Sequence, residues 1–371
     1  MADGTKIEWT DATWQIVTGC AVISPGCTNC YAMRLAGTRL KHHPSRKGLT
    51  RDTKAGPVWT GKVRFNEQWL DQPLRWKTPR MIFVAAHGDL FADGVTDEQL
   101  DQIFAVMALS PQHIFQVLTK RPERMREYLS AIVDTFHASP NSMDERFGSI
   151  CVDVTASPCA SSAFEDVNWP LPNVWLGFSA EDQTRFDARW QSVRPLADAG
   201  WLTWCSGEPL LGSMDIIAAC PGICAECLGI GAHLFVDGPC DACAGSGQDW
   251  DNHGLKWFVA GGESGADARP MHPDWARSLR DQCASAGIPF LFKQWGNWQV
   301  ACEANGHLDH DMARNDAHWV DIDGSRHKPS STGLTKPFAM HRVAKSAAGR
   351  LLDGIEHNGF PPLPNHFKEQ R

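Results

Sequence analysis

Residues 13–36 read TWQIVTGCAVISPGCTNCYAMRLA and set the pattern for the rest of the chain. The short apolar run at 13–18 predicts a buried strand, and the segment 28–40 predicts a helix. Between them stand three cysteines, Cys20, Cys27 and Cys30, with the spacing Cx6Cx2C. This order of strand, cysteine loop and helix predicts the first unit of a β/α protein whose first loop binds a metal group.

The same alternation of strand and helix continues along the 371 residues, which favours an α/β fold with a mainly parallel sheet. The further strands are predicted at 81–86, 113–118, 173–178, 201–205, 256–260 and 288–293. The further helices are predicted at 96–108, 121–136, 182–198 and 273–286. We therefore expect a β/α barrel over 1–214 and 256–300, an insertion at 215–255, and a polar loop with a C-terminal helical tail over 301–371.

Polar residues come directly after most of the predicted strands. They are Asp89; Thr119, Lys120 and Arg121; Ser179, Glu181 and Asp182; Ser206 and Glu208; Gly261, Gly262, Glu263 and Ser264; and Lys293 with Gln294. The carboxyl ends of parallel strands meet at one edge, where such folds build their active sites. A single serine among them is explained equally well as a helix cap. The series as a whole predicts a site in which Lys120, Glu208, Glu263 and Lys293 are the candidate catalytic residues.

The chain holds 13 cysteines and starts without a signal-peptide pattern, and it has no apolar run long enough to span a membrane. We therefore expect a cytoplasmic protein without membrane contact, in which cysteines serve as metal ligands more often than as disulfides. Three thiolates of a [4Fe–4S] cluster leave one iron open, which is the arrangement that binds S-adenosylmethionine. The alternatives are a zinc ion with a fourth ligand from elsewhere and three unligated thiols.

A second cysteine group lies in the predicted insertion, where CAECLGIG at 224–231 is followed by CDACAGSG at 240–247. Cys224, Cys227, Cys240 and Cys243 supply the four thiolates of a closed structural zinc site. The repeat resembles the CxxCxGxG zinc ribbon of DnaJ-type chaperones. A rubredoxin-like iron site and a chance arrangement are the alternatives.

The net charge of −8 conceals a basic segment at residues 31–80, which holds twelve Lys and Arg against three Asp and Glu. Four aromatic residues, Trp59, Phe65, Trp69 and Trp76, are interleaved with these cations. This composition favours contact with the phosphates and bases of a nucleic acid. A solvated surface loop is the alternative.

Several longer motifs resemble one protein family. They are KIEWTDATW at 6–14, the cysteine segment, FQVLTKRPERM at 115–125, LPNVWLGFSAE at 171–181, SGEPLLG at 206–212, FVAGGESGADARP at 258–270 and RVAKSAAGRLLDG at 342–354. Together they resemble the phage-borne three-Cys-motif proteins, which are radical-SAM-like. The resemblance implies a partial (β/α) TIM-like barrel in which Cys20, Cys27 and Cys30 hold the [4Fe–4S] cluster.

The resemblance also implies that Ser206, Gly261, Gly262 and Glu263 contact S-adenosylmethionine. This chain departs from the usual radical SAM pattern, CxxxCxxC with an aromatic residue before the last cysteine, because it has Cx6Cx2C and Tyr31 follows the last cysteine.

Relatives in phage thymidine hypermodification imply an isomerase that converts N-linked to C-linked glycyl-thymidine in phage DNA, as a protection against host restriction. Its partners would be DNA or a modified nucleotide and an electron donor such as flavodoxin, in the host cytoplasm. Two alternatives are a nucleic-acid-binding zinc adaptor without catalysis and a radical SAM enzyme that repairs pyrimidines.

Overall fold

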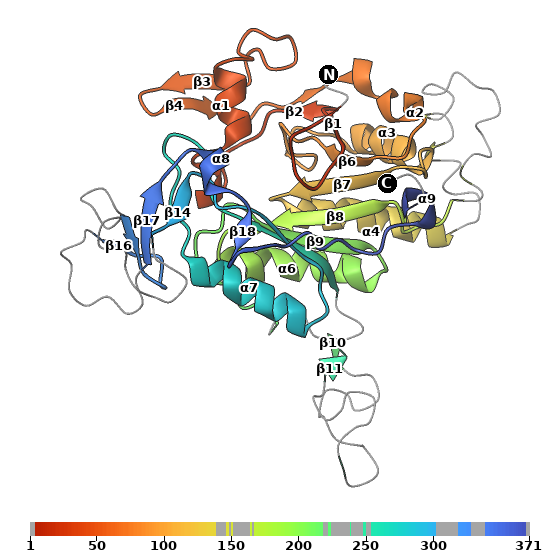
Figure 1. Ribbon diagram of the computed structural model, residues 1–371. Coiled ribbons are helices and arrows are strands. Elements are labelled where there is room, and N and C mark those ends of the chain that lie inside the picture. Colours follow the sequence, from red (N-terminus) through yellow and green to blue (C-terminus); the bar gives the residue numbers. More distant parts are fainter. Residues whose placement is uncertain are drawn as a thin grey trace.

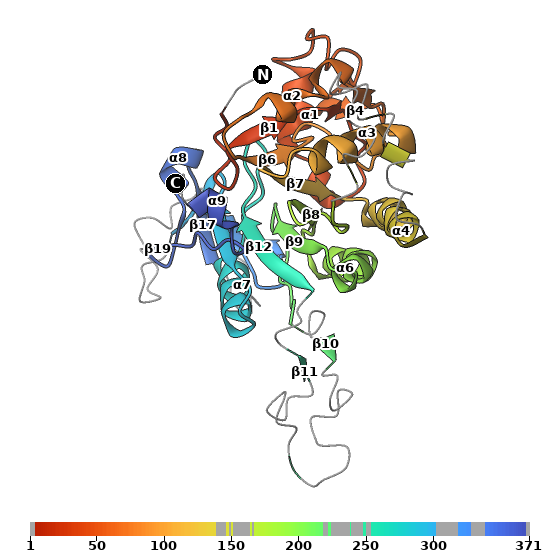
Figure 2. The same ribbon diagram turned by 90° about the vertical axis from the view of Figure 1, so that its right-hand side faces the viewer.

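The computed structural model describes residues 4–138, 167–217, 254–301, 318–327 and 338–368, with residues 146–147, 150, 164, 222–223, 238 and 248–249 between them. Its centre is a sheet of seven parallel strands that follow one another in chain order, β1-β6-β7-β8-β9-β12-β13. These strands are β1 (Ala12–Trp14), β6 (Met81–Val84), β7 (Ile114–Thr119), β8 (Val174–Ser179), β9 (Leu202–Gly207), β12 (Leu255–Gly261) and β13 (Phe290–Gln294). The sheet curls into an open half-barrel (Figures 1 and 2), which confirms the predicted partial barrel.

The convex face of the sheet is covered by the helices that connect the strands, as Figure 2 shows. They are α3 (Asp97–Ala108), α4 (Pro122–Ala138), α6 (Gln183–Asp198) and α7 (Pro273–Ser285). Thr96 begins α3 with a capping box in which Gln99 is the partner, and Asp182 caps α6. All seven predicted strands and all five predicted helices, including the first helix described below, are present, with ends that differ by at most four residues.

The first predicted strand differs most from its prediction. Instead of one strand at 13–18, β1 ends at Trp14, and β2 (Val17–Thr18) leaves the sheet to pair antiparallel with β5 (Arg64–Phe65). The chain then enters the cysteine loop and α1 (Tyr31–Gly37), followed by the hairpin of β3 (Thr50–Thr53) and β4 (Gly56–Trp59). The short helix α2 (Gln72–Arg75) precedes β6.

The described part of 301–371, for which a polar loop and a helical tail were predicted, contains several short strands joined by turns. A four-stranded antiparallel sheet has the order β14-β17-β15-β16, and a hairpin and two helices of four residues follow it. The strands are β14 (Trp298–Val300), β15 (His318–Val320), β16 (Arg326–His327) and β17 (Phe338–Arg342); the later elements are α8 (Lys345–Ala348), β18 (Leu351–Leu352), β19 (Ile355–Glu356) and α9 (Asn365–Lys368).

The base of the predicted insertion is a two-stranded ladder in which β10 (Gly222–Ile223) pairs antiparallel with β11 (Gln248–Asp249). Cys224, Cys227, Cys240 and Cys243 lie outside the described residues, so the zinc ribbon stays a prediction, as do the boundaries of the three predicted units.

The core is divided between the two faces of the sheet. Alternate strand residues such as Ile82, Phe115 and Phe258 pack with the helices in one cluster. The residues between them, on the concave face, join a second cluster with four tryptophans, Trp9, Trp175, Trp204 and Trp257, which we call the tryptophan cluster. Phe360 and Phe367 in the C-terminal segment cover it, and Figure 1 shows this segment crossing the open face of the sheet.

Candidate metal and substrate site at the carboxyl edge

The three cysteines of the first loop lie at the carboxyl end of the first strand, as predicted. Cys20 follows β2, Cys27 ends a single 3-10 turn over Pro25–Cys27, and Cys30 caps the start of α1. None of the three forms a disulfide; Cys27 is buried, and Cys20 and Cys30 are half-buried. One short loop therefore presents three thiols.

Arg121 lies beside the first of these thiols. Its Nη1 is 3.7 Å from the Cys20 Sγ and 2.9 Å from a carboxylate oxygen of Asp89. Asp89 also accepts hydrogen bonds from the Thr119 hydroxyl at 2.7 Å and from the Lys120 amide at 3.3 Å. This buried carboxylate therefore fixes the turn after β7 and directs Arg121 toward the cysteine loop.

The surroundings of Cys20 and Cys30 favour the protonated form of these two thiols. Burial, followed by the negative charge of Asp89, raises the pKa of Cys20 to about 12, although Arg121 opposes the shift. Burial also raises the pKa of Cys30. A cationic metal group reverses this balance because it binds the thiolate form.

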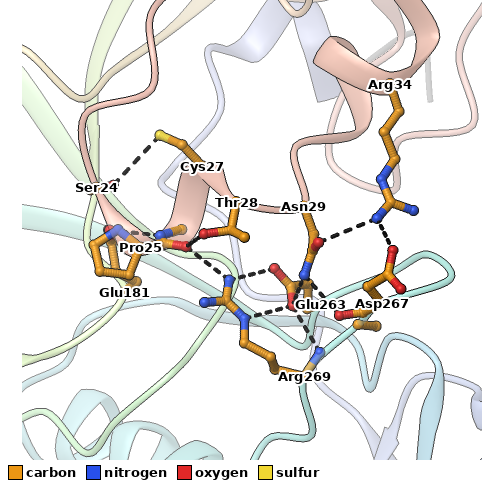
Figure 3. A network of polar contacts seen from close by, with 12 residues as sticks. Ser24, Pro25, Cys27, Thr28, Asn29, Arg34, Glu181, Glu263, Asp267 and Arg269 are labelled. Carbon is orange, nitrogen blue, oxygen red and sulfur yellow. Dashed lines mark hydrogen bonds and ion pairs between the residues drawn. The ribbon is translucent and has the colours of Figure 1, made fainter. Parts of the chain in front are cut away.

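Glu181 holds one side of the loop from beneath. Its Oε1 accepts a hydrogen bond from the Gly26 amide at 3.1 Å (Figure 3). Its Oε2 accepts one from Arg189 at 2.8 Å. Arg189 projects from α6 and also donates to the carbonyl oxygen of Ser179 at 2.7 Å. Burial alone would raise the pKa of Glu181, but Lys120 and then Ser24, Arg189 and the Gly26 amide lower it to about 2. Glu181 is thus an ionised carboxylate that is fully inaccessible to solvent.

Glu263 holds the other side of the loop through Arg269 and Asn29. Its Oε2 accepts hydrogen bonds from the Arg269 Nε at 2.8 Å and from the Asn29 Nδ2 at 3.0 Å, and its Oε1 accepts one from Arg269 at 2.6 Å (Figure 3). Arg269 donates a further bond to the carbonyl oxygen of Pro25 at 2.9 Å. Asn29 and the ion pair of Arg34 with Asp267 extend the network to α1. The loop is therefore fixed on both sides of Cys27 by acid–arginine pairs.

These contacts bear on the candidate role of Glu263. Both of its oxygens are bonded to donors of the protein itself, so an amine or a ribose hydroxyl would share oxygens that already hold the loop. Its predicted catalytic and cofactor-binding roles stay predictions. Sequence reasoning noted Glu181 after a strand without giving it a role, and it missed Arg269 and Asn29, whose place in the network no spacing indicates.

The other candidate residues lie together at what we call the carboxyl edge, which comprises Lys120, Ser206, Glu208, Gly261 and Lys293. They continue, at every second position, the rows of strand residues that form the tryptophan cluster. The Lys293 Nζ is 3.0 Å from the Glu208 Oε1, and the Ser206 hydroxyl is 3.4 Å from the other oxygen.

Lys120 differs from Lys293 in its surroundings. Among the described residues, the Lys120 ammonium group has no hydrogen-bond acceptor or ion-pair partner, although its charge acts on both Glu181 and Cys30. Lys120 is therefore a cation that is available to an anionic group, whereas Lys293 is already neutralised by Glu208.

The two glycines predicted to contact the cofactor are required by packing. A Cβ added to Gly261 would lie 2.8 Å from the Glu208 Oε1, and one added to Gly262 would lie 2.2 Å from the carbonyl oxygen of Trp295. Any side chain at these positions would displace Glu208 or the neighbouring backbone. The contact of Ser206, Gly261 and Gly262 with a cofactor stays a prediction.

Within the described parts of the chain, no three His, Cys, Asp or Glu residues converge on a point where one metal ion could bind. Nor does any helix there combine the length and the apolar composition needed to cross a bilayer.

Comparison with known proteins gives one family and one similar solved structure. A spore photoproduct lyase mutant is similar in structure with 12% sequence identity and a TM-score of 0.37, covering 94% of this chain and 72% of the other. No curated protein matches the sequence. The family model described as "Protein of unknown function (DUF5131)" matches residues 4–361. The chain belongs to this family.

Proposed function

We propose that this protein is a radical S-adenosylmethionine enzyme whose Cys20, Cys27 and Cys30 hold a [4Fe–4S] cluster. One observation carries the proposal: three thiols without a disulfide stand on one short loop at the carboxyl end of a parallel half-barrel. Two buried acid–arginine pairs fix the backbone on either side of the central cysteine.

The donor set fits such a cluster. Thiolates are the ligands of iron–sulfur clusters, and three of them leave one iron for an external ligand. A cluster spreads its cysteines over different irons, so it does not require three side chains to converge on one ion. When bound, the cluster with S-adenosylmethionine supplies an electron for cleavage of the sulfonium and thereby a 5′-deoxyadenosyl radical, which removes a hydrogen atom from the substrate.

The chain's own residues bind and orient the reactants. Arg121 donates toward the sulfur of Cys20 and favours its thiolate. Lys120 offers an unpaired ammonium group to a carboxylate or phosphate, and the pair of Lys293 with Glu208 offers one donor and one acceptor to an amino acid. The tryptophan cluster fills the concave face below and keeps water from the reactive group on that side.

The narrower form of the proposal is isomerisation of N-linked to C-linked glycyl-thymidine in DNA. The C–N bond to the thymine methyl carbon and one Cα–H bond of the glycyl group break, while a C–C bond and an N–H bond form, so no atom is gained or lost. In this form Ser206, Gly261, Gly262 and Glu263 contact S-adenosylmethionine, a donor such as flavodoxin supplies the electron, and the cysteines at 224, 227, 240 and 243 hold a structural zinc ion.

The test is anaerobic reconstitution of the full chain with iron and sulfide. We expect about four iron atoms per chain, and an electron paramagnetic resonance spectrum that changes when S-adenosylmethionine is added. The Cys27→Ala variant should lose this iron, whereas Cys283→Ala, which removes a buried cysteine of α7, should retain it. Full iron and sulfide in Cys27→Ala, or a spectrum indifferent to the ligand, would contradict the proposal.

The substrate is tested separately by incubating the reduced enzyme with glycyl-modified DNA and with irradiated DNA. A product of unchanged mass with carbon-linked glycine supports the isomerase. Reversal of pyrimidine photoproducts instead would identify a repair enzyme.

A further inference from the structure

The hairpin region between α1 and the sheet carries a group of positive charges that have no acidic partner among the described residues. Residues 38–64, which we call the basic lobe, hold eight Lys and Arg against the single acid Asp52. Figure 1 shows α1, β3 and β4 of this region together, on the side to which the strand arrows of β7 and β8 point. The lobe therefore stands next to the carboxyl edge.

Five of these cations have no partner among the described residues. Arg39, Lys47, Arg51, Lys54 and Lys62 are exposed, and none forms an ion pair or a side-chain hydrogen bond there. Only Lys41 is neutralised, by Asp52 at 2.6 Å.

Several arginines elsewhere in the chain are paired with acids of the fold. Arg124 pairs with Asp97, Arg146 with Asp101, Arg185 with Asp182, and both Arg277 and Arg280 with Asp353. In the lobe, by contrast, five cations without such partners lie within one short segment of a chain whose net charge is −8. Because like charges repel, such a cluster costs stability unless a polyanion binds it.

The lobe is rigidly attached to the cysteine loop. Leu49 and Trp59 are buried against Ala32, Met33 and Ala36 of the first helix. A Cβ added to Gly37 would lie 2.0 Å from the Pro57 Cβ, so the hairpin packs directly on the end of α1. Arg46 is buried and lies 2.8 Å from the His87 Nδ1, which anchors the lobe to the end of β6. A polymer held by the lobe is consequently held at a fixed place beside Cys20 and Cys30.

The aromatic residues of the segment do not project from the lobe. Trp59 is buried, and Phe65, Trp69 and Trp76 are half-buried. Contact of these four residues with bases stays a prediction, and the exposed groups of the lobe include most of its cations. The lobe offers exposed charge, which suits a phosphate backbone.

We propose that the basic lobe binds the phosphate backbone of DNA and so presents the substrate to the carboxyl edge. This inference rests on the proposed function for the chemistry that follows binding, whereas the binding itself requires no cluster. Counterion release from the phosphates makes such binding strongly dependent on salt.

The experiment measures fluorescence anisotropy of a labelled DNA of about 20 nucleotides, as single strand and as duplex, with the full chain over a series of NaCl concentrations. Lys47→Gln, Arg51→Gln and Lys54→Gln are combined in one variant. Its matched control combines Arg75→Gln, Lys77→Gln and Lys256→Gln, which removes the same numbers of exposed Arg and Lys outside the lobe.

We expect the slope of log Kd against log salt to fall by about 2 to 3 in the lobe variant, because each lost phosphate contact removes about 0.9. Affinity at low salt should fall by about tenfold or more, whereas the control should stay within about twofold of the parent chain. The assignment is overturned if the parent chain binds neither DNA, or if the lobe variant binds like the control.

Failure of this inference can be told apart from failure of the proposed function. The lobe variant should still form 5′-deoxyadenosine from S-adenosylmethionine without DNA, and Cys27→Ala should still bind DNA. DNA binding through the lobe without any such cleavage in the parent chain would contradict the proposed function and leave this inference intact.

Discussion

On the concave face of the sheet, the tryptophan cluster and the carboxyl edge are built by the same strands from residues of the same parity. Below, Trp175, Trp204 and Trp257 pack ring against ring, with centroids 5.0 Å apart for Trp204 and Trp257. Above, the same rows continue into charged residues such as Glu208 and Lys293. Within a few residues of each strand the interior thus changes from apolar packing to paired charge.

The two regions therefore differ in what they contribute: the tryptophan cluster stabilises the fold, whereas the carboxyl edge carries the candidate catalytic residues. Apolar surface buried in the cluster contributes folding free energy that is independent of pH and of any ligand. The buried carboxylates near the edge gain their stability from specific partners, so single substitutions there change both folding and the site. The predictions below distinguish changes in folding stability from changes at the site.

The largest effect is expected from Trp204→Ala in the tryptophan cluster. Removal of a buried tryptophan should lower the free energy of unfolding by about 3 to 5 kcal/mol, measured by urea denaturation. Iron bound per folded chain should stay unchanged, because no atom of Trp204 contacts the cysteine loop. Trp204→Phe, with a smaller loss, serves if the alanine variant does not fold; a parallel loss of iron would show that the two regions are coupled.

Glu181→Gln should affect both the stability of the fold and the cysteine loop, because it leaves the guanidinium of Arg189 without its carboxylate. Breaking a buried ion pair costs about 3 kcal/mol, and the weakened bond to Gly26 should reduce the iron retained after gel filtration. Asp187→Asn is the control: it changes an exposed acid on α6, the helix that carries Arg189, and should change neither quantity. If Glu181→Gln retained as much iron as the parent chain, the carboxylate of Glu181 would not be needed to fix the cysteine loop.

The pH dependence of stability should reveal the junction between lobe and sheet. Burial, followed by the charge of Arg46, lowers the pKa of His87 from 6.5 to about 4. The folded state therefore holds His87 neutral while the unfolded state takes up a proton, so stability falls as the pH drops from about 6.5 to about 4. The loss should reach up to about 3 kcal/mol, and His87→Gln should flatten the curve in this window.

Glu181 affects folding stability in a separate, more acidic pH range. Its pKa of about 2 in the folded state lies below the ordinary value of 4.5, so its contribution is complete above about pH 4.5 and is lost as the pH falls toward 2. Chemical denaturation at a series of pH values distinguishes the two groups. If the stability of His87→Gln fell between pH 6.5 and 4 as much as that of the parent chain, the pKa of His87 in the folded state would not be lowered.

The smallest effect on stability is expected from Lys120→Gln. Its ammonium group forms no hydrogen bond or ion pair among the described residues and acts on Glu181 only through its charge, so the free energy of unfolding should fall by about 1 kcal/mol or less. If Lys120 binds an anionic reactant, the variant should nevertheless need a higher concentration of S-adenosylmethionine or substrate for half-maximal turnover. Parent-like turnover at limiting concentrations of both would exclude Lys120 from the site.

Much of the fold could be predicted from the sequence because buried parallel strands such as 174–179 are short apolar runs between helices with clear caps. The break after Trp14 could not, because it depends on the pairing of Val17 with Phe65, which are 48 positions apart. The cysteine loop was evident from its spacing. The residues that fix the loop could not be predicted, because Glu181 and Arg269 act through contacts that only the folded chain creates. Gly26 and Glu181, for example, are more than 150 positions apart in the sequence.

The closure of the tryptophan cluster has a consequence for the time course of folding. Trp9 belongs to the same cluster as Phe367, and Trp257 donates a hydrogen bond to the carbonyl oxygen of Gly359 and stacks on Phe360. These contacts join the two ends of the described chain, and contacts of such long sequence separation form slowly. During synthesis the concave face of the sheet therefore stays uncovered until residues 359–367 have left the ribosome, and until then its apolar surface is exposed to aggregation.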